Sequence, residues 1–223
     1  MHLRKSKKIL IYLSLFFLVG SINNIELSKI NLSKISKIKI SGLGKENNKS
    51  LSENIKSLKL GNIFLIKKNK LINLIESNSL VENYDIFKVY PSSLYINIQK
   101  TKFLARINHN GINYIVGSNG KLSNNNLYDK NLPFIFGKPR IDEFLRFKKI
   151  IDLSKFEYKE IKNLYFFPTG RWDIEFNNNV LIKLSDKNVE QNLELVYEFL
   201  NNNNFGDIKI IDVRIENQII LNG

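Results

Sequence analysis

The order of periodic segments between residues 34 and 101 constrains the fold more than any other feature of the sequence. Ile38 and Ile40 alternate with polar residues, as in a half-buried strand. Ser50 and Glu53 have the spacing of a capping box, which predicts the start of a helix. The predicted elements are a strand at 34–43, helices at 50–58 and 68–78, and strands at 81–90 and 93–101. This β-α-α-β-β order predicts a small α+β module.

Residues 102–223 are rich in predicted strands. Asn177–Asn179 lies between two alternating segments and predicts a hairpin turn. Trp172, the only tryptophan, is predicted to anchor a core. The predicted elements are strands at 113–116, 161–168, 171–176, 180–184, 208–215 and 218–221, with helices at 142–153 and 187–200. We therefore expect a mostly antiparallel β domain with flanking helices, in a chain of the α+β class.

The apolar run that begins at Ile9 and ends at Ile22 is either a membrane anchor or a signal peptide. Lysines precede the run and none follows it before Lys29, so the N-terminus is predicted to be cytoplasmic and the rest exported. Val19-Gly20-Ser21 is a passable cleavage site. The anchor interpretation gives a tail at 1–8, an anchor at 9–26 and a linker at 27–34. Its predicted membrane-facing residues are Ile9, Leu13, Phe16, Phe17 and Val19.

The net charge of +13 raises the question of nucleic-acid binding. The cations are 28 Lys against 6 Arg, and they are dispersed along an exported chain, so we expect no nucleic-acid partner. The lysines at 29, 34, 37 and 39 follow the apolar run and favour anionic lipid headgroups. Because there is no cysteine, disulfides, thiol chemistry and cysteine zinc sites are excluded, and stability must come from packing.

Catalytic groupings are sparse. With only His2 and His109, no histidine triad or metal set can be assembled. Ser36/Lys39 and Ser118/Lys121 have the spacing of a Ser-Lys hydrolase, but chance supplies such pairs in a lysine-rich chain. The carboxylate pairs Asp142/Glu143 and Glu157/Glu160 are interpreted as residues at the start of a helix and on the surface. We predict no enzyme, no cofactor, no metal and no small-molecule substrate.

Several weak motifs occur in one order along the chain. They are Ile38-Lys-Ile-Ser-Gly42, Leu60-Gly-Asn-Ile63, Tyr90-Pro-x-x-Leu-x-Ile96, Ile115-Val-Gly-Ser-Asn-Gly120, Leu132-Pro-Phe-Ile-Phe-Gly137, Arg171-Trp-Asp-Ile174 and Ile211-Asp-Val-Arg214. Taken together, the sequence resembles the FtsQ/DivIB family of bacterial cell-division proteins. The resemblance implies a single N-terminal membrane helix, a POTRA domain at 35–101 and a β domain at 102–223.

The resemblance also implies a non-enzymatic scaffold of the septum, with its C-terminal domains in the periplasm and its anchor in the inner membrane. Its expected partners are FtsB- and FtsL-like division proteins, bound by addition of a β-strand to the last strand of the β domain. The partner-binding residues implied are Arg171, Ile215, Asn217, Ile219, Ile220 and Leu221. An anchored scaffold favours the anchor over the signal peptide. The alternative function is an exported POTRA-type binding module in envelope assembly or secretion.

Overall fold

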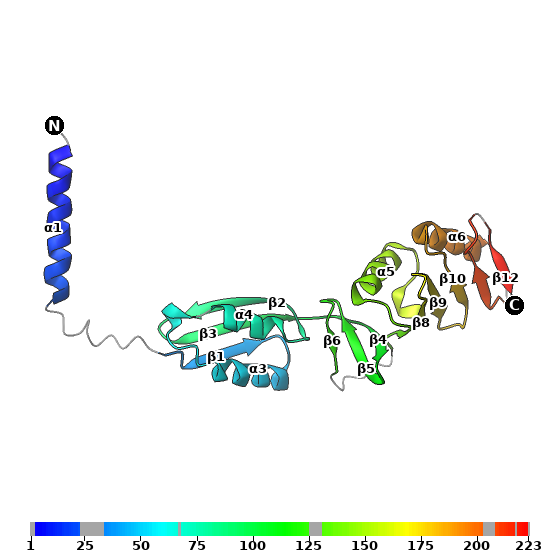
Figure 1. Ribbon diagram of the computed structural model, residues 1–223, viewed down its shortest axis with the longest axis horizontal. Helices are drawn as coiled ribbons and strands as arrows, with labels where there is room; N and C mark the ends of the chain where they lie inside the picture. The colour runs from blue at the N-terminus through cyan, green and yellow to red at the C-terminus, as the bar shows by residue number, and fades with distance from the viewer. Residues whose placement is uncertain are drawn as a thin grey trace. The chain divides into compact units, whose positions relative to one another are not determined.

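The computed structural model describes residues 3–22, 34–66, 68–124, 131–202, 208–216 and 218–222. The chain divides into two compact units, one of residues 1–74 with 85–97 and one of residues 75–84 with 98–223 (Figure 1). The predicted linker, apart from Lys34, lies outside the described residues. So do residues 23–26 of the predicted anchor and Asn217 of the predicted partner site.

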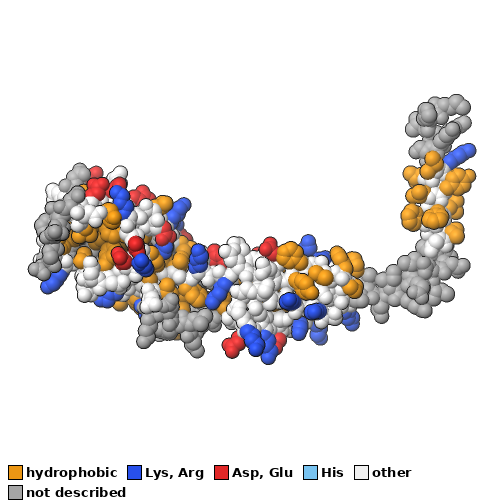
Figure 2. Space-filling model, turned by 180° about the vertical axis from the view of Figure 1, so that it is seen from behind, with side chains coloured by type: hydrophobic (Ala, Val, Ile, Leu, Met, Phe, Trp, Pro, Cys, Tyr) orange, Lys and Arg blue, Asp and Glu red, His pale blue; other side chains and the backbone are white. Residues whose placement is uncertain are grey.

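Helix α1 (Leu3–Ile22) contains the apolar run. Its large apolar side chains from Ile9 to Val19 are all half or more exposed, and hydrophobic side chains cover much of the face of the helix that is seen in Figure 2. Within the described part of the chain, no helix is both long and apolar enough to cross a membrane.

Residues 34–101 form a three-stranded sheet with two helices, in the predicted β-α-α-β-β order. The elements are β1 (Lys37–Ser41), α3 (Lys45–Ser57), the 3-10 helix η1 (Ile63–Leu65), α4 (Lys68–Glu76), β2 (Val81–Val89) and β3 (Ser93–Lys100). The strand order is β1-β3-β2, with β1 parallel to β3. Leu94, Ile96 and Ile98 of the central strand are buried, as are Ile55 of α3 and Ile75 of α4. This core therefore follows the alternation seen in the sequence.

Helix α3 begins five residues earlier than the capping box at Ser50 and Glu53 predicts, so that predicted start is wrong. Gly44 precedes the helix with φ of 88°, a conformation that glycine adopts without steric cost. The Asn48 side chain accepts a hydrogen bond from the Leu43 N–H at 3.0 Å. The helix start is therefore fixed by a glycine and an asparagine rather than by a serine cap.

The second unit contains a nine-stranded sheet with the order β12-β11-β10-β9-β8-β7-β4-β5-β6. The strands are β4 (Phe103–His109), β5 (Ile112–Gly117), β6 (Leu122–Ser123), β7 (Phe134–Phe136), β8 (Ile161–Phe166), β9 (Trp172–Phe176), β10 (Leu181–Lys183), β11 (Ile210–Asp212) and β12 (Ile220–Asn222). The helices are α5 (Ile141–Leu153), the 3-10 helix η2 (Tyr158–Glu160) and α6 (Val189–Asn202). Neighbouring strands are antiparallel except for β4–β7, β7–β8 and β10–β11. The β domain is thus mostly antiparallel, and its strands β4, β6 and β7 were not predicted.

One apolar core lies between this sheet and helices α5 and α6. Trp172 is 5% exposed, and its ring stacks on Phe147 of α5 at a centroid distance of 4.6 Å. Phe166 of the neighbouring strand contacts the same ring at 4.8 Å. The predicted role of Trp172 as a core anchor is therefore confirmed.

Asn119, in the turn after β5, holds residues 79–81 within the second unit. Its side-chain amide donates to the carbonyl oxygens of Ser79 at 3.0 Å and Val81 at 2.8 Å. One carboxylate oxygen of Glu82 accepts hydrogen bonds from the Thr101 and Ser118 hydroxyls, both at 2.8 Å. These bonds link Ser79, Val81 and Glu82 to residues 101, 118 and 119 within the second unit.

We expect Trp172→Ala to lower the free energy of unfolding by about 3–5 kcal/mol, because it opens a cavity against Phe147 and Phe166. Urea unfolding followed by circular dichroism measures the change. Leu153→Ala is the matched control, since Leu153 is 73% exposed, and it should change the free energy of unfolding by less than about 0.5 kcal/mol. Equal stability of the two variants would contradict the assigned core.

Candidate functional site

Strand β12 is the terminal strand of the nine-stranded sheet and has a described strand on one side only. It pairs with β11 in antiparallel register, Ile210 opposite Asn222, Ile211 opposite Leu221 and Asp212 opposite Ile220. All three of its residues are exposed. An exposed edge strand presents unpaired N–H and C=O groups to any chain that approaches it. This edge is the candidate site.

The hydrogen bonds of β11 establish which backbone groups of β12 face outward. Val213 N donates to Lys183 O of β10, and Lys209 O accepts from Leu181 N of β10, whereas the Lys209 N–H donates to Asn222 O of β12 at 3.2 Å. The backbone groups of Ile211 and Val213, within and just after β11, therefore face β10. The alternate residues, Ile210 and Asp212, therefore face β12. Their partners in the register, Asn222 and Ile220, face back toward β11. Leu221, between them, consequently directs its N–H and C=O to the open edge.

The predicted edge segment 215–221 is only partly a strand. Ile215 is 53% exposed and lies in the bend between β11 and β12, where its carbonyl accepts from the Gln218 N–H at 3.2 Å. Ile219 is partly buried and packs against the core. Ile220 and Leu221 are in β12, at 48% and 39% exposure. The strand that offers its backbone is therefore three residues long.

Arg171, the other predicted partner residue, is not brought to this edge. It precedes β9, and β10 and β11 lie between β9 and β12. Three strand spacings correspond to about 14 Å. Its guanidinium lies over the Phe167 ring at 4.0 Å, and its Nε is 3.3 Å from a carboxylate oxygen of Asp173. Arg171 thus has interactions within its own domain.

A row of charged residues that the sequence reasoning missed crosses the sheet toward β12. In the paired registers Asp173 lies opposite Lys183, Lys183 opposite Asp212, and Asp212 opposite Ile220. Arg214 follows β11, and its Nε donates to Asp212 at 2.8 Å. The alternation in Ile211-Asp-Val-Arg214 is the signal that could have placed Asp212 and Arg214 on one face.

The pKa of Asp173 and the pKa of Asp212 are shifted in opposite directions. Burial raises the pKa of Asp173, which is 3% exposed, although the nearby cations Arg171, Arg214 and Lys183 oppose the shift. Hydrogen bonds from the Arg214 guanidinium lower the pKa of Asp212. Asp212 therefore carries a full negative charge at neutral pH, on the strand that supports β12.

A second polar group lies on the same face of the sheet, around Glu175 of β9. Its carboxylate accepts hydrogen bonds from Lys162 at 2.8 Å, Asn163 at 2.9 Å and the Tyr165 hydroxyl at 2.6 Å. Burial raises the pKa of Glu175, but these three donors outweigh it and bring the pKa to about 2. The carboxylate is therefore stabilised in its charged form.

The residues considered for catalysis have other partners. The Ser118 hydroxyl donates to Glu82 at 2.8 Å, whereas Lys121 donates to the backbone carbonyls of Glu76 and Asn78. The Ser36 hydroxyl lies 2.9 Å from that of Ser92. Among the residues that the structure describes, no cluster of histidine and acidic side chains could hold a metal ion. The open backbone of β12 is thus the feature with a clear chemical use.

A β-α-α-β-β module followed by a β domain with an open terminal strand defines a protein of the POTRA-plus-β-domain class. A family model for the POTRA domain of FtsQ type matches residues 33–100. A model for the C-terminal part of cell division protein FtsQ/DivIB matches residues 105–214. The chain belongs to the FtsQ/DivIB family of cell-division proteins, a family of non-catalytic scaffolds that are anchored to the membrane.

No curated protein matches the chain. Among solved structures, it is similar to the major extracytoplasmic domain of the trans isomer of the bacterial cell division protein DivIB from Geobacillus stearothermophilus. The identity is 12% and the TM-score is 0.32, over 47% of this chain and 98% of that one.

We expect acid to destabilise the second unit through Glu175. Its folded-state pKa of about 2 lies below the ordinary 4.5, so its contribution is present above about pH 4.5 and is lost as the pH falls toward 2. We expect a loss of about 1–3 kcal/mol over this range. Urea unfolding of the full chain in detergent, followed by Trp172 fluorescence at several pH values, measures it.

Glu175→Gln should remove this part of the pH dependence, because the amide does not titrate. Glu194→Gln is the matched charge control, since the Glu194 side chain is 62% exposed. If the two variants had the same acid dependence, the assigned role of Glu175 would be wrong.

Proposed function

We propose that this protein is a divisome scaffold that recruits FtsB- and FtsL-like proteins to the septum. In this proposal an FtsB-like segment adds as a strand to the open side of β12. The observation that carries it is the placement of β12 at the end of the nine-stranded sheet, with all three residues exposed. The match to the FtsQ/DivIB C-terminal model supports this role over that of a general envelope-assembly module.

The register of β12 specifies what the partner strand meets. Leu221 offers the outward N–H and C=O, which a partner strand satisfies with one carbonyl and one amide. Ile220 and Leu221 project to opposite faces of the sheet and supply the apolar side-chain contacts. Strand addition draws affinity from the backbone and specificity from such alternate side chains.

Charge contributes to the choice of partner under the same proposal. Arg171 stays the predicted contact for an acidic partner residue, although its guanidinium is held by Asp173 and Phe167. Arg214 is closer to the edge in strand order, because it follows β11. Its side chain is 41% exposed. We propose Arg214 as a second cation that an acidic residue of the partner strand can approach.

We further propose that α1 holds the chain in the inner membrane, with its N-terminus cytoplasmic and the POTRA and β domains periplasmic. The exposed apolar side chains between Ile9 and Val19 support this, since lipid can cover them. Lys7 and Lys8 precede them, as expected for a cytoplasmic flank. In the sequence the anchor is predicted to extend to residue 26.

Leu221→Pro is the sharpest test of strand addition. Proline removes the outward N–H, whereas the groups that face β11 belong to Ile220 and Asn222 and stay intact. We expect copurification of the FtsB-like partner to fall tenfold or more, about 1.4 kcal/mol. Leu221→Ala keeps the N–H and should retain most of the binding. Pull-downs from the native host with each variant measure this.

Thermal unfolding of the same variants keeps the result interpretable, since the melting temperature should change little at an exposed edge. Ile220→Pro is a less selective variant because the Ile220 backbone faces β11. Wild-type recovery of the partner by a folded Leu221→Pro chain would refute strand addition at β12.

The anchor is tested by carbonate extraction of membranes. We expect the 26.0 kDa chain to stay in the membrane pellet and to be released only by detergent. Replacement of Leu13 and Phe16 by Glu should release it, because a charged residue at the centre of a membrane segment costs about 2.5–3.5 kcal/mol. A soluble chain that begins near Ile22 would instead support cleavage of a signal peptide.

A further inference from the structure

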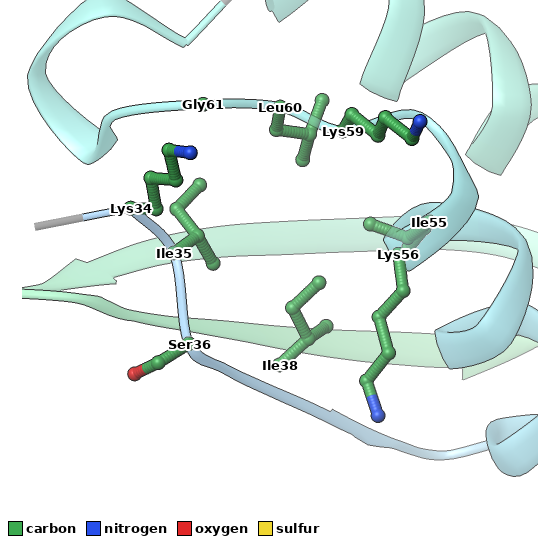
Figure 3. A pocket seen from close by; sticks show the side chains of 9 residues that line it. All are labelled: Lys34, Ile35, Ser36, Ile38, Ile55, Lys56, Lys59, Leu60 and Gly61. Carbon is green, nitrogen blue, oxygen red and sulfur yellow. The ribbon is translucent and has the colours of Figure 1, made fainter.

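A cavity of about 570 Å³ lies in the first unit, where the described chain resumes at Lys34. Its apolar lining comes from Ile35, Ile38, Ile55 and Leu60, and Figure 3 shows these side chains between β1 and the segment that follows α3. Lys34, Lys56 and Lys59 also line it, and no acidic residue does. Within the described residues none of these three lysines forms a salt bridge.

Exposed apolar side chains lie beside the cavity. Lys34 forms an isolated antiparallel β-bridge with Asn62 through the backbone. The Asn62 side chain accepts a hydrogen bond from the Phe64 N–H at 2.8 Å. Phe64 stacks on Tyr90 with a centroid distance of 4.8 Å. Phe64, Leu65 and Tyr90 are 54%, 75% and 57% exposed. Three large apolar side chains therefore project into solvent near Lys34, which lines the cavity together with Lys56 and Lys59.

The length of the chain limits how far this surface can lie from α1. Only residues 23–33, eleven in number, separate Ile22 from Lys34. Even fully extended, this segment spans at most about 40 Å. If α1 is anchored as proposed above, the surface stays within this distance of the end of α1, and its effective concentration near the membrane raises the effect of a weak affinity for lipid.

We propose that Lys34, Lys56, Lys59, Phe64, Leu65 and Tyr90 form a lipid-contacting surface, which rests on the anionic leaflet of the membrane. This inference relies on the proposed anchor. Apolar and aromatic side chains enter the interfacial layer, while lysines attract anionic headgroups. In Figure 3 the three amines lie apart from one another and do not converge on one point. They are therefore suited to several headgroups on a charged surface rather than to one chelated phosphate.

The absence of cysteine provides a site-specific test in the full chain. Leu65→Cys carries a polarity-sensitive fluorophore, and the chain is reconstituted in phosphatidylcholine vesicles with or without phosphatidylglycerol. We expect a blue shift, and quenching by lipid-borne quenchers, only when phosphatidylglycerol is present, and a loss of both at high salt. The same label at Leu153→Cys, an exposed apolar position of the second unit, should not respond.

Replacement of Lys34, Lys56 and Lys59 by Gln in the labelled chain should weaken docking about fivefold per lysine, or about a hundredfold in all. An unchanged melting temperature shows that these exposed substitutions do not unfold the module. A label that stays water-like with phosphatidylglycerol would overturn the proposal. So would an equal response in neutral vesicles, or shielding by a division protein instead of lipid.

Carbonate extraction of the same samples separates the two proposals. A chain that resists extraction while its label at 65 stays water-like refutes the surface and leaves the anchor intact. A chain that carbonate extracts refutes the anchor, and the label at 65 then reports directly whether the surface binds added vesicles.

Discussion

Backbone N–H and C=O groups require hydrogen-bond partners, and this requirement constrains the terminal strands of the nine-stranded sheet. Eight junctions join the adjacent strands of the nine-stranded sheet. Among the described strands, β12 and β6 each have a neighbour on one side, so their outer sides depend on water or another chain. At one end β12 is three residues long, and its central residue directs both backbone groups outward. A short edge limits uncontrolled pairing, yet it leaves a template that a strand of suitable sequence can use. The site thus follows from the way in which the sheet ends.

The two faces of this sheet have different roles near the edge. On the face covered by α5 and α6, Leu164, Ile174, Ile182 and Ile211 lie opposite one another across four strands and are fully buried. On the other face the corresponding row contains Asp173, Lys183 and Asp212, with alternating charge. The apolar row holds β11 in place, and β11 in turn holds β12. The charged row gives the surroundings of β12 a polarity that a partner strand must match.

Local patterns in the sequence predicted the helices and strands in which apolar residues recur with a regular spacing. Helix α5 and strands β8 to β10 lie where the spacing of apolar residues places them, and Trp172 is in the core. Strand β7 was missed because three residues in a strand with parallel neighbours on both sides show no alternation. The start of α3 was missed because Gly44 and Asn48 replace the usual serine cap.

The candidate site was predictable only in part, for a related reason. The last strand was predicted from the residue pattern at 218–221 and its partner-binding role from the family resemblance, but which residues face outward depends on the pairing of β10 with β11. These two strands are parallel and are separated in the sequence by α6, so no local pattern reveals their register. The same strand order separates Arg171 from β12, which its place in the Arg171-Trp-Asp-Ile174 motif did not indicate.

The two proposed contacts, one at the surface around Lys34 and one at the edge of β12, differ in physical kind. The surface around Lys34 acts through unpaired lysines, whose attraction to anionic lipid decays within a Debye length and weakens with salt. The edge of β12 acts through backbone hydrogen bonds and apolar side chains, which salt screens little. Changes in ionic strength or lipid charge can therefore loosen the first contact more than the second. A scaffold with these two contacts can stay bound to its protein partner while its association with the membrane surface is adjusted.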